Sequence, residues 1–121
     1  MSNLQLYKFL GAVSYPLYRF AHPIFFWLYA VYKSKTDKFK LALLKQYVKP
    51  GHIVMDIGAH IGFYSLALAN LTGESGHVIA FEPDRTNFQF LRKNTKKFSQ
   101  ISINQKAVGA TSGMLKLFRS R

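Results

Sequence analysis

The chain contains no cysteine among its 121 residues. This absence excludes disulfide frameworks, thiolate zinc sites and thiol nucleophiles, and it argues against a disulfide-stapled secreted domain. The hydrophobic content of 49% is nevertheless ample for a buried core. We therefore expect a folded protein of a reducing compartment, with the cytoplasm as its default location.

Acidic residues are scarce. Five Asp and Glu residues stand against 17 Lys and Arg residues, which gives a formal net charge of +12. This balance favours anionic partners such as nucleic acid, phospholipid headgroups or phosphorylated substrates, but charge alone identifies none of them. Three of the acids, Asp56, Glu82 and Asp84, come at the ends of two expected strands. Their grouping indicates a local role.

Long hydrophobic runs are also missing. The longest run, residues 24–32, is well below the roughly 20 residues that a helix needs to cross a bilayer. Extending it backwards adds Pro23 and Arg19, which a membrane-spanning helix tolerates poorly, and no small-residue cleavage site follows it. We favour a helix that packs on the rest of a larger protein. Because lysines flank the aromatic residues, an interfacial contact with a membrane surface stays open.

The sequence changes character near Lys49, Pro50 and Gly51. Residues 1–49 are aromatic-rich and helical in pattern, whereas residues 50–121 alternate short apolar runs with helical stretches. We therefore expect a helical N-terminal segment followed by part of an α/β domain.

Turn and capping residues divide the N-terminal segment into helices. Ser2 and Gln5 have capping-box spacing for a first helix, which Pro16 is expected to break. Thr36 is expected to cap a third helix. The apolar face predicted for that helix comprises Phe39, Leu43, Leu44 and Tyr47.

The C-terminal part alternates strands and helices. Strands are expected at residues 53–57, 77–81 and 101–108, and helices at residues 63–71 and 85–98. This order and these lengths are typical of the opening of a doubly wound sheet, with parallel strands and right-handed crossovers. The predicted fold class is α/β: the N-terminal part of a Rossmann-like sheet, preceded by aromatic-rich helices.

A glycine-containing loop ends the first expected strand, with the sequence Asp-Ile-Gly-Ala-His-Ile-Gly at residues 56–62. In a doubly wound sheet, ligands bind beyond the carboxyl ends of the strands, where loop amides point at the ligand. A side chain at Gly58 or Gly62 would keep a cofactor from lying against the backbone of the turn. The loop is therefore a candidate cofactor site.

The loop departs from the dinucleotide fingerprint Gly-x-Gly-x-x-Gly, because His60 occupies the central position. Asp56 would repel a pyrophosphate but suits a cationic ligand that carries a sulfonium and an ammonium group. Glu82, 20 residues after Gly62, ends the second strand, where an acid accepts hydrogen bonds from ribose hydroxyls. Two carboxylates at neighbouring strand tips predict a site for S-adenosylmethionine rather than NAD.

Several segments closely resemble the FkbM family of S-adenosylmethionine-dependent methyltransferases. The resemblance covers roughly residues 48–118 and is carried by residues 54–65, 78–84 and 107–109. It implies that residues 56–65 form the cofactor loop. It also implies a ribose-binding acid in the segment Phe-Glu-Pro-Asp and an adenine that lies near the end of the third strand.

The resemblance and the loop chemistry together give a set of expected cofactor contacts. Two residues of the set have a structural alternative. Ser65 could instead hydrogen-bond a free amide of the helix, and Tyr64 could instead pack against the sheet. The residues of the set are Asp56, Gly58, Ala59, His60, Gly62, Tyr64, Ser65, Glu82, Pro83, Ala107 and Val108.

The resemblance further implies methyl transfer to a hydroxyl oxygen on a sugar or natural product, so that the partner would be a small-molecule or glycan acceptor. Family members continue with further strands that complete the sheet and form the acceptor pocket, whereas this sequence stops at Arg121. We expect the isolated chain to have an unpaired strand edge, an uncovered apolar face, poor stability and no turnover. No catalytic residue is assigned.

Two other functions stay open. The aromatic helices favour a non-catalytic, basic module that binds a membrane surface or another protein, and the high charge favours an RNA methyltransferase. Nucleic acid is not the favoured partner, because a basic cluster on one helix face is more often a solvated surface. That cluster comprises Arg92, Lys93, Lys96 and Lys97.

The four histidines suggest no metal site. His22, His52 and His77 lack the spacing of metal ligands, and cysteine is absent. His60, near glycines on both sides, is expected to be a spacer rather than a general base. We therefore expect no metal ion.

Overall fold

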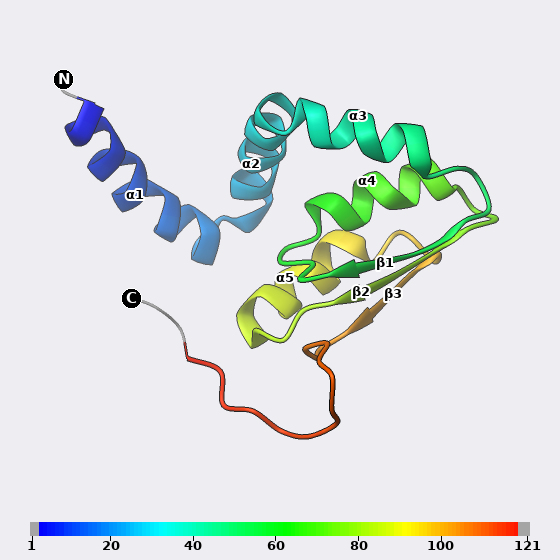
Figure 1. Ribbon diagram of the computed structural model, residues 1–121. Coiled ribbons are helices and arrows are strands. Elements are labelled where there is room, and N and C mark those ends of the chain that lie inside the picture. The colour runs from blue at the N-terminus through cyan, green and yellow to red at the C-terminus, as the bar shows by residue number, and fades with distance from the viewer. Residues whose placement is uncertain (1–2, 119–121) are drawn as a thin grey trace. The chain divides into compact units, whose positions relative to one another are not determined.

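The computed structural model describes the backbone of residues 3–118 and the side chains of residue 5 and residues 11–118. The chain divides into two compact units, residues 1–40 and residues 41–121, here called the helical unit and the sheet unit. The elements, shown in Figure 1, are α1 Asn3–Phe20, α2 His22–Thr36, α3 Lys38–Tyr47, β1 Ile53–Ile57, α4 Phe63–Thr72, β2 His77–Phe81, α5 Arg85–Thr95 and β3 Ile101–Asn104.

The first helix runs through its proline. α1 continues past Pro16 to Phe20, so the predicted break at Pro16 is wrong. Pro16 and Ala12 are both exposed, and water can therefore bond the carbonyl of Ala12 that loses its helical donor. The expected cap at Ser2 lies outside the described residues.

Aromatic rings join α1 to α2 within the helical unit. Tyr18 makes edge-on contacts with His22 and Phe25, with ring centroids 5.7 and 5.3 Å apart. His22 is the buried residue of α2, and one of its ring nitrogens lies 3.4 Å from the carbonyl oxygen of Tyr18. Pro23 lies in the first turn of α2, where a missing amide donor costs little. Among the helices that the structure describes, none has the length and apolar character needed to span a membrane.

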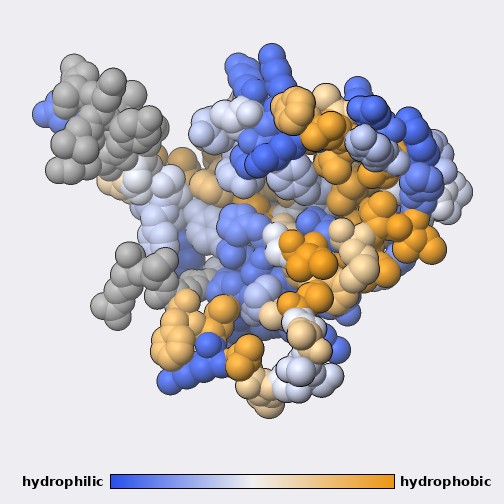
Figure 2. Space-filling model, viewed as in Figure 1, coloured by the Kyte–Doolittle hydropathy of each residue, from blue (hydrophilic) through white to orange (hydrophobic). Residues whose placement is uncertain are grey.

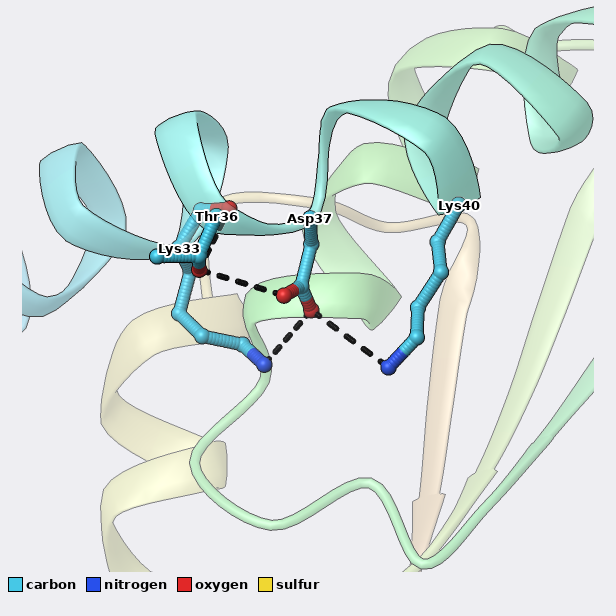
Figure 3. Close-up of polar contacts among 4 residues, drawn as sticks. All are labelled: Lys33, Thr36, Asp37 and Lys40. Atoms are coloured by element: carbon cyan, nitrogen blue, oxygen red, sulfur yellow. Dashed lines mark hydrogen bonds and ion pairs between the residues drawn. The ribbon is translucent and has the colours of Figure 1, made fainter.

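Asp37 separates α2 from α3. Its carboxylate pairs with Lys33 at 2.6 Å and with Lys40 at 3.9 Å, and it accepts a hydrogen bond from the Thr36 hydroxyl at 3.1 Å (Figure 3). The hydrogen bond to Asp37 raises the pKa of Lys33, although burial opposes it. Thr36 belongs to the last turn of α2, so the prediction that it caps α3 is wrong.

The buried face of α3 differs from the predicted one. Leu44 packs against the core of the sheet unit together with Val48, which follows the helix. Phe39, Leu43 and Tyr47 are exposed. The predicted face is therefore wrong except at Leu44. Because the alternative apolar stripes of a short helix have similar strength, its neighbours decide which stripe is buried.

The sheet has three parallel strands in the order β1-β2-β3. Its register pairs Ile53 with His77 and Val78 with Ile101. The predicted alternation of strands and helices is confirmed. The last strand is shorter than expected, because residues 105–118 form neither helix nor strand.

One face of the sheet carries the core. Val78 packs with Leu68 of α4, and Ala80 packs with Leu91 of α5. Because Val78 and Ala80 are two residues apart on one strand, both helices cover the same face (Figure 1). Consecutive right-handed crossovers produce this arrangement when the strands follow each other in order.

The other face of the sheet is apolar and exposed along β1. Its exposed residues are Ile53, Met55 and Ile57, which alternate with half-buried ones. Hydrophobic residues gather in Figure 2 in the region where the strands lie in Figure 1. Within the described residues, β1 also forms one edge of the sheet. The expected open face and open strand edge are thus both present in the structure.

Candidate functional site

The loop between β1 and α4 is tied to the end of β2. The backbone amides of Gly58 and Ala59 both donate to the carbonyl oxygen of Phe81, each at 2.9 Å. Gly58, His60 and Gly62 all have positive φ angles, of 78°, 54° and 102°. The loop is therefore a tight turn that begins at the carboxyl end of one strand and is held by the carboxyl end of the next.

The two loop glycines meet different surroundings. A Cβ at Gly58 would meet nothing within 4 Å, so the turn is open on that side. A Cβ at Gly62 would lie 3.0 Å from Leu91 and 3.3 Å from Thr95, both on α5. Gly58 thus leaves open space beside the turn, as expected for a ligand site. The missing side chain of Gly62 instead makes room for α5.

Glu82 joins the loop to the following turn. The residue is only 6% exposed, and its two carboxylate oxygens accept hydrogen bonds from the amides of His60 and Asp84, each at 2.8 Å. The bond to His60 spans 22 residues of sequence. Since each carboxylate oxygen has two lone pairs, Glu82 keeps acceptor capacity beyond these bonds.

Asp56 lies at the carboxyl end of β1, half-buried. Its carboxylate accepts a 2.6 Å hydrogen bond from the hydroxyl of Ser65, which is fully buried in the first turn of α4. Burial raises the pKa of Asp56; the bond from Ser65 opposes this shift, and the charge of Glu82 adds to it. Ser65 therefore positions Asp56, a role that the sequence did not predict.

The remaining residues of the expected set have varied surroundings. Tyr64 is half-buried, with its ring edge-on to Phe63 at 5.2 Å. Pro83 is half-buried between Glu82 and Asp84. Ala107 and Val108 are exposed and lie beyond the end of β3.

Three further polar residues hold the turns around the loop, and the two asparagines among them were not predicted from the sequence. Asp84 caps α5 by accepting a bond from the amide of Asn87 at 2.8 Å. Asn94, two turns further along α5, donates to the carbonyl of Ile61 in the loop at 2.7 Å. Asn104 ends β3, and its carbonyl accepts the amide of Glu82 at 3.0 Å. An Asp before a helix is a recognisable cap signal, whereas nothing local marks the two asparagines.

The histidines outside the loop make separate contacts. His77 lies 2.7 Å from the hydroxyl of Ser102 on the neighbouring strand, and His52 accepts a bond from the amide of Lys49 at 3.2 Å. His22 belongs to the helical unit. None of these hydrogen-bonding partners is a residue of the loop 58–62.

Comparison with family models finds no match, and neither does comparison with curated proteins. Solved structures do match. A candidate rRNA methylase from Clostridium thermocellum has a TM-score of 0.55 at 22% identity, with 58% of this chain and 39% of that chain covered. A SAM-dependent O-methyltransferase from Thermotoga maritima has a TM-score of 0.52 at 27% identity, with coverage of 60% and 28%.

A third match is fibrillarin from Aeropyrum pernix, solved with natively bound S-adenosyl-L-methionine. It has a TM-score of 0.51 at 20% identity, and the match covers 58% of this chain and 32% of that chain. The chain has the fold of the N-terminal part of class I methyltransferases. The predicted α/β fold class is thereby confirmed. The chain spans well under half the length of the structures that it matches.

Proposed function

We propose that the β1–α4 loop and the end of β2 bind S-adenosylmethionine, and that the protein acts in methyl transfer as a methyltransferase of the FkbM type. The observation that carries the proposal is the hydrogen bond from the His60 amide to Glu82. It joins the expected ribose acid at the end of β2 to the expected cofactor loop at the end of the neighbouring strand β1. Such a junction at the carboxyl ends of parallel strands is where doubly wound sheets bind nucleosides.

The residues present fit this cofactor. Gly58 leaves the turn open, Glu82 keeps acceptor capacity for ribose hydroxyls, and Asp56 is close enough to Glu82 for their charges to interact. A cationic ligand beside the two acids would offset their repulsion. When bound, the cofactor supplies an electrophilic methyl group on a sulfonium. The chain's residues bind and orient it, and this positioning is the main source of rate in such a transfer.

The structural neighbours support the cofactor, since they include SAM-dependent methyltransferases and one protein solved with the cofactor. The FkbM type and the acceptor, a hydroxyl oxygen on a sugar or natural product, are supported by the sequence resemblance at residues 54–65 and 78–84. The contacts at the eleven expected residues are part of the same proposal.

Isothermal titration of the chain with S-adenosylmethionine tests the site. We expect saturable binding that weakens at least about tenfold in Glu82→Gln, because a charge-assisted hydrogen bond to ribose is lost. Glu74→Gln is the matched control, since Glu74 is an exposed acid in the turn between α4 and β2. Circular dichroism establishes that both variants stay folded. Absence of binding by the folded chain, or equal affinity of all three proteins, would contradict the proposal.

A second candidate, an RNA methyltransferase, is favoured by the net charge of +12 and by the exposed basic residues of α5 and the turn after it. Two of these residues already contact rings, with Arg92 over Phe88 at 5.1 Å and Lys93 over Phe90 at 5.6 Å. RNA binding that falls steeply with salt, and weakens in the double variant Lys96→Gln and Lys97→Gln, would support this candidate. Absence of RNA binding at low salt would exclude it.

A further inference from the structure

The second helix exposes a continuous apolar stripe. Each stripe residue has another stripe residue three or four positions away in the sequence, which places them on one face of a helix. The central residue, Trp27, is 64% exposed. This α2 stripe comprises Ile24, Trp27, Leu28, Val31 and Tyr32.

Other residues of α2 make the contacts within the helical unit. His22, Phe25 and Tyr29 form a row of ring contacts, and Phe25 also meets Tyr18 of α1. Phe26 stacks on His22 with centroids 6.0 Å apart. Since His22 and Phe25 contact α1 through Tyr18, the described contacts between the two helices do not use the α2 stripe.

The helical unit that carries the α2 stripe is strongly positive. The single acid of the first 50 residues, Asp37, is bound by Lys33 and Lys40. Lys35 and Lys38 follow the stripe and are exposed. The basic residues of the helical unit lie at positions 8, 19, 33, 35, 38 and 40.

We propose that the α2 stripe docks on an anionic lipid bilayer. α2 lies in the plane of the interface, with the stripe at the boundary between headgroups and acyl chains and the lysines at the headgroups. A helix with tryptophan and tyrosine among aliphatic residues, bordered by lysines, has the composition of interfacial membrane helices. Hydrophobicity alone would fit many partners of the stripe. The net positive charge complements anionic lipid and therefore favours an anionic bilayer as the partner. This inference goes beyond the proposed function and does not depend on it.

Trp27 makes the docking directly measurable, because it is the only tryptophan of the chain. We expect its fluorescence to shift to shorter wavelength on addition of phosphatidylcholine vesicles that contain phosphatidylserine, and brominated lipids to quench it. The chain should float with these vesicles and much less with pure phosphatidylcholine. High salt should weaken the binding, because it screens the lysines.

Variants separate the apolar and electrostatic contributions. Leu28→Asp should abolish flotation and the spectral shift, because a carboxylate would have to enter the apolar boundary. Leu115→Asp is the matched control: Leu115 is 97% exposed in the sheet unit, and we expect no change. Lys35→Glu combined with Lys38→Glu should lower affinity for the anionic vesicles at least about tenfold. All of these residues are exposed, so circular dichroism should show intact folding.

Three outcomes would overturn the proposal. One is a Trp27 spectrum that does not change with anionic vesicles. Another is equal loss of binding in Leu28→Asp and Leu115→Asp, which would show that the stripe is not specific. The third is a Trp27 spectrum that is already shifted and shielded from a soluble quencher without lipid, because a second copy or another part of the protein would then cover the stripe.

Discussion

In the sheet unit Val78, Ala80 and Leu91 are fully buried, whereas in the helical unit Phe20 is 86% exposed and Trp27 is exposed as well. The acids show the same contrast. Four of the five lie in the sheet unit, three of them at or beside strand ends, whereas Asp37 of the helical unit is bound between two lysines.

The difference shows how the arrangement of secondary structure decides which apolar residues stay at the surface. Parallel strands with helices on one face bury apolar residues and bring polar strand ends together. Two helices that pack through a narrow row of rings leave much of their apolar surface outside. This contrast is the basis of the two proposals, a small-ligand site in the sheet unit and a surface for a large, flat partner in the helical unit. The following substitutions test this contrast.

The largest effect is expected from shortening leucines in the two units. Leu91→Ala should destabilise the sheet unit by about 3 kcal/mol, because it leaves a cavity against Ala80 and Phe88. Leu28→Ala, at a site 47% exposed, should change the stability of the helical unit by less than about 1 kcal/mol. Hydrogen exchange with mass spectrometry follows α5 and α2 separately. Equal losses in the two units would remove the contrast.

Adding a methyl group to a glycine should have opposite effects in the two units. Gly62→Ala should cost about 2 kcal/mol, because its φ is +102° and the new Cβ would lie 3.0 Å from Leu91. Gly11→Ala, in α1 with open space around it, should stabilise its helix by about 1 kcal/mol. Chemical denaturation followed by circular dichroism measures both changes. A neutral Gly62→Ala would mean that α5 does not press against the loop.

The pH dependence of stability tests the burial of Asp56. The pKa of Asp56 in the folded protein is raised above its usual value of 3.8, so folding favours the neutral carboxyl group. Its contribution to the free energy of unfolding is therefore fully present below pH 3.8 and is lost as the pH rises through the folded pKa. Asp56→Asn should therefore raise the melting temperature at neutral pH, and the gain should shrink in acid. It should also weaken binding of S-adenosylmethionine. A gain that does not vary with pH would point to a cause other than ionisation.

The smallest change is expected at Asp37. Asp37→Asn should cost less than about 1 kcal/mol, because ion pairs of this kind contribute little. It should nevertheless strengthen binding to anionic vesicles, since it frees the charge of Lys33 and Lys40. Vesicle titration monitored by Trp27 measures the effect, and Glu74→Gln controls for the change in net charge. Weaker vesicle binding in Asp37→Asn would contradict the docking geometry.

Much of the sheet unit could be predicted because its signals are local. Short apolar runs separated by turn residues indicate strands, and the glycine loop and Glu82 lie where the pattern places them. Pro16 misled the prediction of α1 because its tolerance depends on exposure. The length of β3 was overestimated because a strand ends where its neighbour ends, and β2 stops at Phe81.

The amino-acid sequence by itself determined the order of elements, the excess of positive charge and the positions of the acids along the chain, since these follow from composition and local periodicity. Only the tertiary structure decided that Gly62 faces α5, that Ser65 holds Asp56 and that Glu82 receives the amide of His60. It also decided which apolar stripe of α2 stays exposed. Each of these features is a contact, or the lack of one, that depends on how the chain's segments pack, and no local pattern encodes it.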